Sequence, residues 1–82
     1  MKNLDSRVAA ITGASSGIGR ALALELAAQG CDLALSSNSN QQALTETARL
    51  AAQRGVKVTQ QKVDVAQRAQ VEDWARQVVA DH

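Results

Sequence analysis

Three glycines with an unusual spacing carry the strongest chemical signal in the sequence. They lie in segment 12–19, Thr-Gly-Ala-Ser-Ser-Gly-Ile-Gly, between an apolar run and a helical pattern. In such a turn Gly13 lets the chain leave a strand sharply, Gly17 leaves space for a pyrophosphate, and Gly19 allows close packing of helix and sheet. The N–H groups and the dipole of the helix then face the anion. The segment therefore predicts a site for dinucleotide phosphates.

Other interpretations of this segment explain less of it. A purely structural connection would not need three glycines between strand and helix. A nucleoside-triphosphate P-loop ends in Gly-Lys-Ser/Thr, whereas here Gly19 is followed by Arg20 and Ala21. Ser15 and Ser16 add hydroxyl donors to the expected site. Arg20 is expected in the first helical turn, either as a solvated residue or as a contact to the pyrophosphate.

Three apolar runs alternate with three helical patterns along the chain. Unbroken apolar runs suit strands covered on both faces, and apolar residues repeating every three to four positions suit helices. Residues 39–42 read as a capping box for the second helix. The predicted strands cover 7–12, 31–35 and 56–63, and the predicted helices cover about 16–29, 40–54 and 67–82.

Each predicted helix has an apolar stripe that should face the sheet. The stripe of the first helix is expected to include the large residues at four-residue spacing. The three stripes are Ile18, Leu22 and Leu26; then Leu44, Ala48 and Ala51; then Val71, Trp74, Ala75 and Val78.

The alternation β-α-β-α-β-α predicts an α/β fold with a parallel sheet and right-handed crossovers. The first two helices should share one face. The third strand is the most polar and suits an edge, whereas the first is the most apolar, which gives the order 3-2-1. We therefore expect a three-layer Rossmann-type half in a single domain, residues 1–82.

Composition excludes several classes of function. The net charge is +1, so no electrostatic footprint for nucleic acid exists, and no apolar stretch is long enough to span a membrane. One cysteine and one histidine exclude an internal disulfide and a multi-cysteine or His-rich metal site. The N-terminus lacks an apolar signal-peptide core, and we expect a cytoplasmic location.

Segment 12–19 resembles the N-terminal signature of the classical short-chain dehydrogenase/reductase family, Thr-Gly-x-x-x-Gly-Ile/Leu-Gly, at every fixed position, Ile18 included. The resemblance continues to Val63-Asp64-Val65. It implies that Asp64 accepts a hydrogen bond from the adenine amino group and that Val65 packs beside the ring. Capping of the third helix is the alternative role of Asp64, and the two roles can coexist.

The resemblance covers about the first third of a typical family member. It implies an oxidoreductase that transfers a hydride between a nicotinamide cofactor and an alcohol or carbonyl substrate. The family's catalytic Ser and Tyr-x-x-x-Lys are not matched, since the chain has no tyrosine. We therefore expect cofactor binding without catalysis by this chain alone. The alternatives are a non-catalytic dinucleotide-binding module and a structural half-fold that self-associates.

The end of the second strand should discriminate NAD from NADP. An acidic residue there binds the ribose diol of NAD, and the resemblance aligns that position with Ser37. The family's basic NADP markers would fall at Ser16 and Asn38, and neither is basic. The uncharged segment 36–39 can hydrogen-bond a phosphate without repelling it, which favours NADP over NAD. Asp32 lies at the opposite end of the strand, where a surface role at the helix end is expected.

The first strand, 7–12, is expected to have an open edge, which favours association. A homo-oligomer is predicted, with the first strands of two copies paired in parallel about a two-fold axis along the strands. Trp74 is interpreted as a core residue or as a half-exposed interface residue. Cys31 is expected to be a buried inert thiol, and His82 to be solvated.

Overall fold

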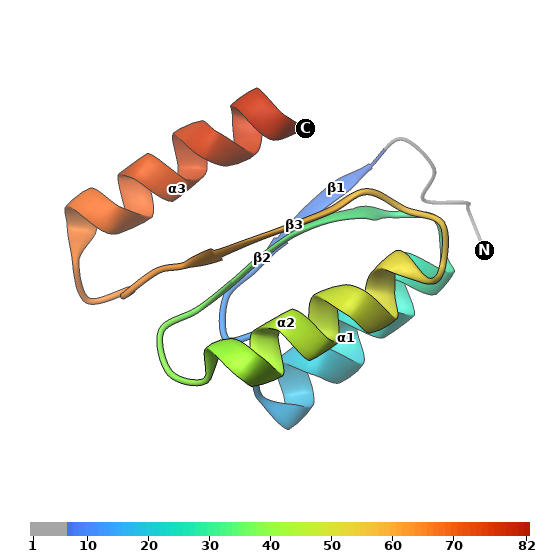
Figure 1. Cartoon of the computed structure of the whole chain (residues 1–82). Helices are drawn as coiled ribbons and strands as arrows, with labels where there is room; N and C mark the ends of the chain where they lie inside the picture. Colours follow the sequence, from blue (N-terminus) through green and yellow to red (C-terminus); the bar gives the residue numbers. More distant parts are fainter. Residues whose placement is uncertain (1–6) are drawn as a thin grey trace.

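Parallel strands alternate with helices along the chain, and Figure 1 shows the helices on both sides of the sheet. The computed structural model describes residues 7–82. The expected single domain also includes residues 1–6, which lie outside the described part. The elements are β1 (Val8–Ile11), α1 (Gly17–Ala28), β2 (Asp32–Ser37), α2 (Gln41–Ala52), β3 (Val58–Lys62) and α3 (Arg68–Asp81).

The strand order is β1-β2-β3, which confirms the predicted order 3-2-1 with the polar strand at an edge. The central strand is the most deeply buried part of the chain, because it has a neighbour on each side and helices on both faces. Leu33, Ala34 and Leu35 are all 0% exposed. Among residues 7–82, β1 pairs with β2 alone, so its other edge is open, and the Val8 side chain on this strand is 42% exposed.

Two apolar clusters lie on opposite faces of the sheet. Helices α1 and α2 pack on one face and α3 on the other, as expected for the first two crossovers (Figure 1). The alternation of side chains along β2 serves both clusters, since Leu33 and Leu35 point to one face and Ala34 to the other. The core interpretation of Trp74 is confirmed: its side chain is buried against Ala34 and Val63.

The predicted stripe of α1 is wrong. Ile18 is 87% exposed and Leu22 is 49% exposed, and of the three expected residues only Leu26 packs against the core. The residues of α1 that are buried are small: Gly19, Ala23 and Ala27. Small side chains let the helix axis approach the sheet closely, whereas periodicity weighted by side-chain size selects the neighbouring stripe. The stripes of α2 and α3 are confirmed at their buried and half-buried residues Leu44, Ala48, Ala51, Val71, Trp74 and Val78, whereas Ala75 is exposed.

Several predicted boundaries shift by one or two residues. The second strand starts and ends later than predicted, because Ser36 and Ser37 continue the ladder with β3. The cap of α2 is Asn40 and not Ser39, since the Asn40 side chain accepts a hydrogen bond from the Ala43 N–H at 3.0 Å.

Two end residues have contacts that differ from the expectation. Asp32 does not have a surface role at a helix end: its Oδ1 accepts from the Lys57 backbone N–H at 2.9 Å and ties β2 to the segment before β3. His82 is not simply solvated, because its Nε2 lies 2.9 Å from the Thr59 hydroxyl. Within residues 7–82, no helix has the length and apolarity needed to cross a membrane.

We predict that Cys31 reacts slowly with a chromogenic disulfide reagent at pH 8. The thiol is 3% exposed, and burial raises its pKa, with a further rise from the Asp32 carboxylate. The rate should be at least about tenfold lower than in urea, because less thiolate is present and access is blocked. Equal rates in native buffer and in urea would show that the thiol is accessible.

The same shift in pKa gives a direction for stability. The native thiol keeps its proton to a higher pH than the unfolded one, because burial in the native chain raises its pKa. The contribution to stability is therefore complete below the unfolded pKa and is lost as the pH rises through the native one. Unfolding in urea should become easier across this alkaline range, and Cys31→Ala should remove that part of the pH dependence.

Candidate functional site

The carboxyl ends of the three strands meet at one edge of the sheet, because all three strands are parallel. The predicted site residues follow these ends: the glycine-rich loop after β1, Ser37 and Asn38 at the end of β2, and Asp64 and Val65 after β3. Ligands of open parallel α/β sheets bind outside this edge. The fold thus brings the three predicted segments to the same side of the molecule.

The loop before α1 is shaped by its own backbone and by one serine. Gly13 has a φ of +66°, a conformation that favours glycine. The Ser16 hydroxyl donates to the Gly13 carbonyl at 2.8 Å and accepts from the Gly19 N–H at 3.3 Å, so Ser16 is the cap of α1. This hydroxyl therefore holds the loop, and the exposed start of the helix remains available to an anion.

The two later glycines of the loop have different surroundings. A Cβ at Gly17 would meet nothing within 4 Å, so the space beside this residue is open. A Cβ at Gly19 would lie 2.1 Å from the Gly13 carbonyl oxygen, so any side chain there would force the loop backbone to shift. Close packing at Gly19 thus involves the backbone of the loop itself, whereas packing against the sheet was expected. Gly17 is the position with room for a ligand.

Two exposed apolar side chains and one carboxylate border this edge. Ile18 is next to the open Gly17, and Val65 is 62% exposed after β3. The Asp64 Oδ1 accepts from the Ala66 N–H at 3.0 Å, in a turn that precedes α3. The cap of α3 is Gln67, so the Asp64 carboxylate shapes the approach to the helix and does not cap it.

The end of β2 is less accessible than the sequence suggested. Ser37 is 3% exposed, and its hydroxyl lies 2.7 Å from the Ser15 hydroxyl and accepts from the Ser39 N–H at 3.3 Å. Asn38 is exposed. The Ser36 hydroxyl is buried, and it has no hydrogen-bond partner within the described part of the chain.

Backbone groups of β2 fix the neighbouring loops. The Ser36 carbonyl accepts from the Ala14 N–H at 3.1 Å, which anchors the glycine-rich loop. The Ser37 carbonyl accepts from the Val63 N–H at 3.2 Å, and it also accepts from the Gln41 side chain at 2.9 Å. The last two residues of the central strand therefore position both flanking segments.

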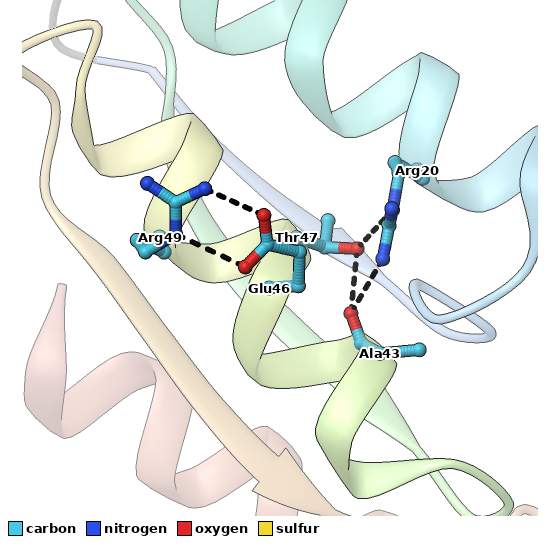
Figure 2. Close-up of polar contacts among 5 residues, drawn as sticks. All are labelled: Arg20, Ala43, Glu46, Thr47 and Arg49. Atoms are coloured by element: carbon cyan, nitrogen blue, oxygen red, sulfur yellow. Dashed lines mark hydrogen bonds and ion pairs between the residues drawn. The ribbon is translucent and has the colours of Figure 1, made fainter.

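Arg20 points toward neither the solvent nor the phosphate side, which corrects both expectations. Its Nε donates to the Thr47 hydroxyl at 2.9 Å and its Nη2 donates to the Ala43 carbonyl at 2.9 Å, so the side chain bridges α1 and α2 (Figure 2). Thr47 is fully buried, and its hydroxyl lies 2.9 Å from the Ala14 carbonyl. Sequence reasoning missed Thr47, although a polar residue close to the apolar stripe of Leu44 and Ala51 is a signal that could have found it.

A surface ion pair on α2 lies beside the hydrogen bonds of Arg20 and Thr47 and shares none of them. Arg49 donates to Glu46 at 3.0 and 2.5 Å on the exposed side of α2 (Figure 2). Hydrogen bonding from Arg49 lowers the pKa of Glu46, with smaller charge effects from Arg49 and Arg20. Exposed pairs of this kind contribute little to stability, because water and salt screen the two charges.

The arrangement can bind an anion, and it contains no metal centre in the described part of the chain. No cluster of three or more His, Cys, Asp or Glu side chains that could hold a metal occurs in residues 7–82. The first turn of α1 has no acidic residue, so no negative charge opposes an anion at this helix end. The chemistry of the site is recognition by N–H and hydroxyl groups.

Known proteins are similar to this chain in sequence and in fold. The family model described as short chain dehydrogenase matches residues 7–82. The chain is 46% identical over 80 residues to SadH of Mycobacterium tuberculosis, which covers 98% of this chain and 29% of SadH.

Two solved structures extend the comparison. NAD+-bound xylitol dehydrogenase superposes with a TM-score of 0.93 at 32% identity, over 98% of this chain and 30% of that one. An alcohol dehydrogenase from Thermococcus sibiricus, complexed with 5-hydroxy-NADP, gives 0.84 at 39% identity, over 92% and 32%. The chain thus spans less than a third of the length of these relatives. With the fold, the glycine-rich loop and the family match in agreement, the chain belongs to the short-chain dehydrogenase family of oxidoreductases.

Proposed function

We propose that this chain binds a nicotinamide dinucleotide as the cofactor-binding part of an oxidoreductase. The reaction of the whole enzyme would be hydride transfer between the cofactor and an alcohol or carbonyl substrate, with the hydride chemistry supplied by the bound cofactor. The observation that carries the proposal is the open space at Gly17 beside the tightly packed Gly19. A turn that is closed on one side and open on the other suits an anion at the helix N-terminus.

Each predicted site residue has a role in this proposal. The backbone of Gly13, Gly17 and Gly19 and the Ser15 side chain would surround the pyrophosphate, while Ser16 would keep the loop in shape. The proposed adenine contacts are the Asp64 carboxylate and the exposed Val65 side chain. The Ile18 side chain, which is 87% exposed, would cover the bound ligand.

Binding without turnover is proposed for the 82-residue chain. No tyrosine is present to match the family's Tyr-x-x-x-Lys, so no residue here is assigned a catalytic role. Since the chain spans less than a third of the length of its relatives, we expect micromolar or weaker affinity. The proposed unit is one cofactor-binding domain, and the proposed compartment is the cytoplasm, with which the buried free thiol of Cys31 is compatible.

NADP is the proposed cofactor in preference to NAD. The end of β2 has no acidic side chain at Ser37 or Asn38, so nothing there repels a 2′-phosphate. The hydroxyls of Ser15 and Ser37, which now contact each other, are donors that a phosphate could engage.

We predict that Gly17→Val abolishes NADPH binding without unfolding the chain. The added side chain would occupy the open space beside the backbone and meet no protein atom within 4 Å of its Cβ. Calorimetric titration with NADPH measures the loss, and circular dichroism checks the fold.

Gly19→Ala is compared with Gly17→Val, because it adds a side chain to the same loop at a position that has no open space. Its Cβ would clash with the Gly13 carbonyl, so this variant should lose about 1–3 kcal/mol of stability. Unchanged NADPH affinity in Gly17→Val would refute the site assignment.

We predict that Ser37→Asp shifts the preference from NADPH to NADH. The carboxylate would accept from the Ser15 hydroxyl and the Ser39 N–H, bind a ribose diol and repel a 2′-phosphate. We expect NADPH affinity to fall about tenfold, or roughly 1.4 kcal/mol. Ser37→Asn, which has the same shape without the charge, should retain NADPH affinity. Equal NADPH affinity in Ser37→Asp and Ser37→Asn would contradict the assignment.

Self-association through the open edge of β1 is also proposed for this chain. The Arg7 carbonyl accepts from the Asp32 N–H, so the backbone groups of Val8 and Ala10 point away from β2. The parallel pairing expected from the sequence uses a two-fold axis along the strands. This axis would place Val8 of one copy opposite Val8 of the other, whereas a parallel ladder needs the bonding residues of the two strands to be offset by one residue. A two-fold axis perpendicular to the sheet pairs the strands antiparallel, and Val8 of one copy then exchanges hydrogen bonds with Ala10 of the other.

The antiparallel arrangement also explains the exposure of Leu22. Arg20 faces α2, and Leu22 lies two residues further, about 200° around the helix, on the side away from α2. Two copies paired through β1 would bring their α1 helices together on the same face of a six-stranded sheet. The half-exposed Leu22 would then be covered by the second copy.

We predict a dimer in solution that Val8→Lys converts to a monomer, because a lysine on an edge strand opposes strand pairing. Val79→Lys is the control, since Val79 is 82% exposed on α3 and distant in sequence from β1. Light scattering over a concentration range measures the mass. A monomeric wild-type chain at high micromolar concentration would overturn the proposal.

A further inference from the structure

The Ala14 residue of the glycine-rich loop is held from two directions. Ala14 is fully buried, and its N–H donates to the Ser36 carbonyl of β2 at 3.1 Å. Its carbonyl accepts from the Thr47 hydroxyl of α2 at 2.9 Å. Because its N–H and its carbonyl are both held by hydrogen bonds, Ala14 fixes the direction of the loop that follows it.

The Thr47 hydroxyl can donate only one hydrogen bond, and two carbonyls compete for it. The Ala14 oxygen lies at 2.9 Å and the Ala43 oxygen, one turn earlier in α2, at 3.0 Å. Arg20 shifts the competition toward Ala14, because its Nη2 donates to the Ala43 oxygen at 2.9 Å and occupies one of the two lone pairs of that carbonyl (Figure 2). Its Nε donates to the Thr47 oxygen at 2.9 Å, which polarises the hydroxyl and strengthens its bond to Ala14.

The orientation of the Ala14 carbonyl determines that of the next amide. In a planar trans peptide the C=O and the following N–H point in opposite directions. Since the Ala14 carbonyl points at Thr47, the Ser15 N–H points away from α2. Ser15 lies in the loop that leads to the N-terminus of α1, where an anion would bind.

We infer that Thr47 and Arg20 are positioning residues that orient the Ala14–Ser15 peptide for recognition of a phosphate. Thr47 acts from α2 and Arg20 from α1, and both act through the Ala14 carbonyl and not through a contact with the ligand. This inference rests on the proposed dinucleotide site and adds to it a determinant outside the glycine-rich motif. The inference makes two separate claims about recognition. Binding of the phosphate depends on the hydrogen bonds among Arg20, Thr47 and Ala14, whereas binding of the adenine after β3 does not.

Thr47→Val tests the inference, because valine keeps the shape of threonine and removes the hydroxyl. We expect ADP affinity to fall about fivefold to tenfold, as for the loss of one oriented hydrogen bond. Adenosine, which has no phosphate, should bind within about twofold of wild type, by the same reasoning. Calorimetric titrations of both ligands give the ratio, and circular dichroism reports the fold.

Three further variants provide controls. Thr47→Ser retains the hydroxyl and should restore ADP affinity. Thr45→Val makes the same change at an exposed position of α2 and should alter neither ligand. Arg20→Lys retains the charge but not the rigid fork that reaches both acceptors, so it should weaken ADP and spare adenosine.

The outcomes distinguish this inference from the proposed function. Equal ADP affinity in wild type and Thr47→Val overturns the inference, and so does an equal loss for ADP and adenosine, which indicates general damage. If the wild-type chain binds neither ligand, the proposed function fails for this chain. The Ser15 amide then decides the inference, since its NMR chemical shift in the ligand-free chain should change in Thr47→Val and stay constant in Thr45→Val.

Discussion

The two hydrogen bonds accepted by the last backbone carbonyls of β2 organise this edge of the molecule. Ser36 holds the loop after β1 through Ala14, and Ser37 holds the segment after β3 through Val63. Neither contact could form if the central strand ended two residues earlier. The neighbouring loops therefore take their positions from the length of one strand, and the predicted binding residues, which are far apart in sequence, come together as a consequence.

The small buried residues of α1 determine how this helix contacts α2 and the solvent. Gly19, Ala23 and Ala27 bring α1 close to the sheet, and the same closeness places Arg20 within reach of Thr47 on α2. A bulkier buried stripe would hold the helix further out. Large apolar side chains are consequently displaced to the outside of α1, where Ile18 and Leu22 contact water. Close helix packing and an exposed apolar surface thus have one cause.

The order of the elements, the sheet topology and the glycine-rich turn could be predicted because local patterns determine them. The buried stripe of α1 could not, because the apolar periodicity gives more weight to Leu22 than to Ala23. The bridge from Arg20 to Thr47 depends on how two helices pack, which no local pattern reports. The burial of Ser37 was missed for a similar reason: its cover comes from the loop after another strand.

The central position of β2 would also link binding at the proposed site to folding. The loops can reach their final geometry only after β2 has paired with strands that precede and follow it in the chain, since both anchors lie at its end. A partly folded chain in which β2 pairs with only one of its two neighbours would lack the loop that the other neighbour brings to the proposed site. At the proposed site, ligand would bind only the fully paired state, so the ratio of folded to unfolded chain would rise with ligand concentration. Resistance to thermal unfolding would then report occupancy of a site that lies entirely at one end of the sheet.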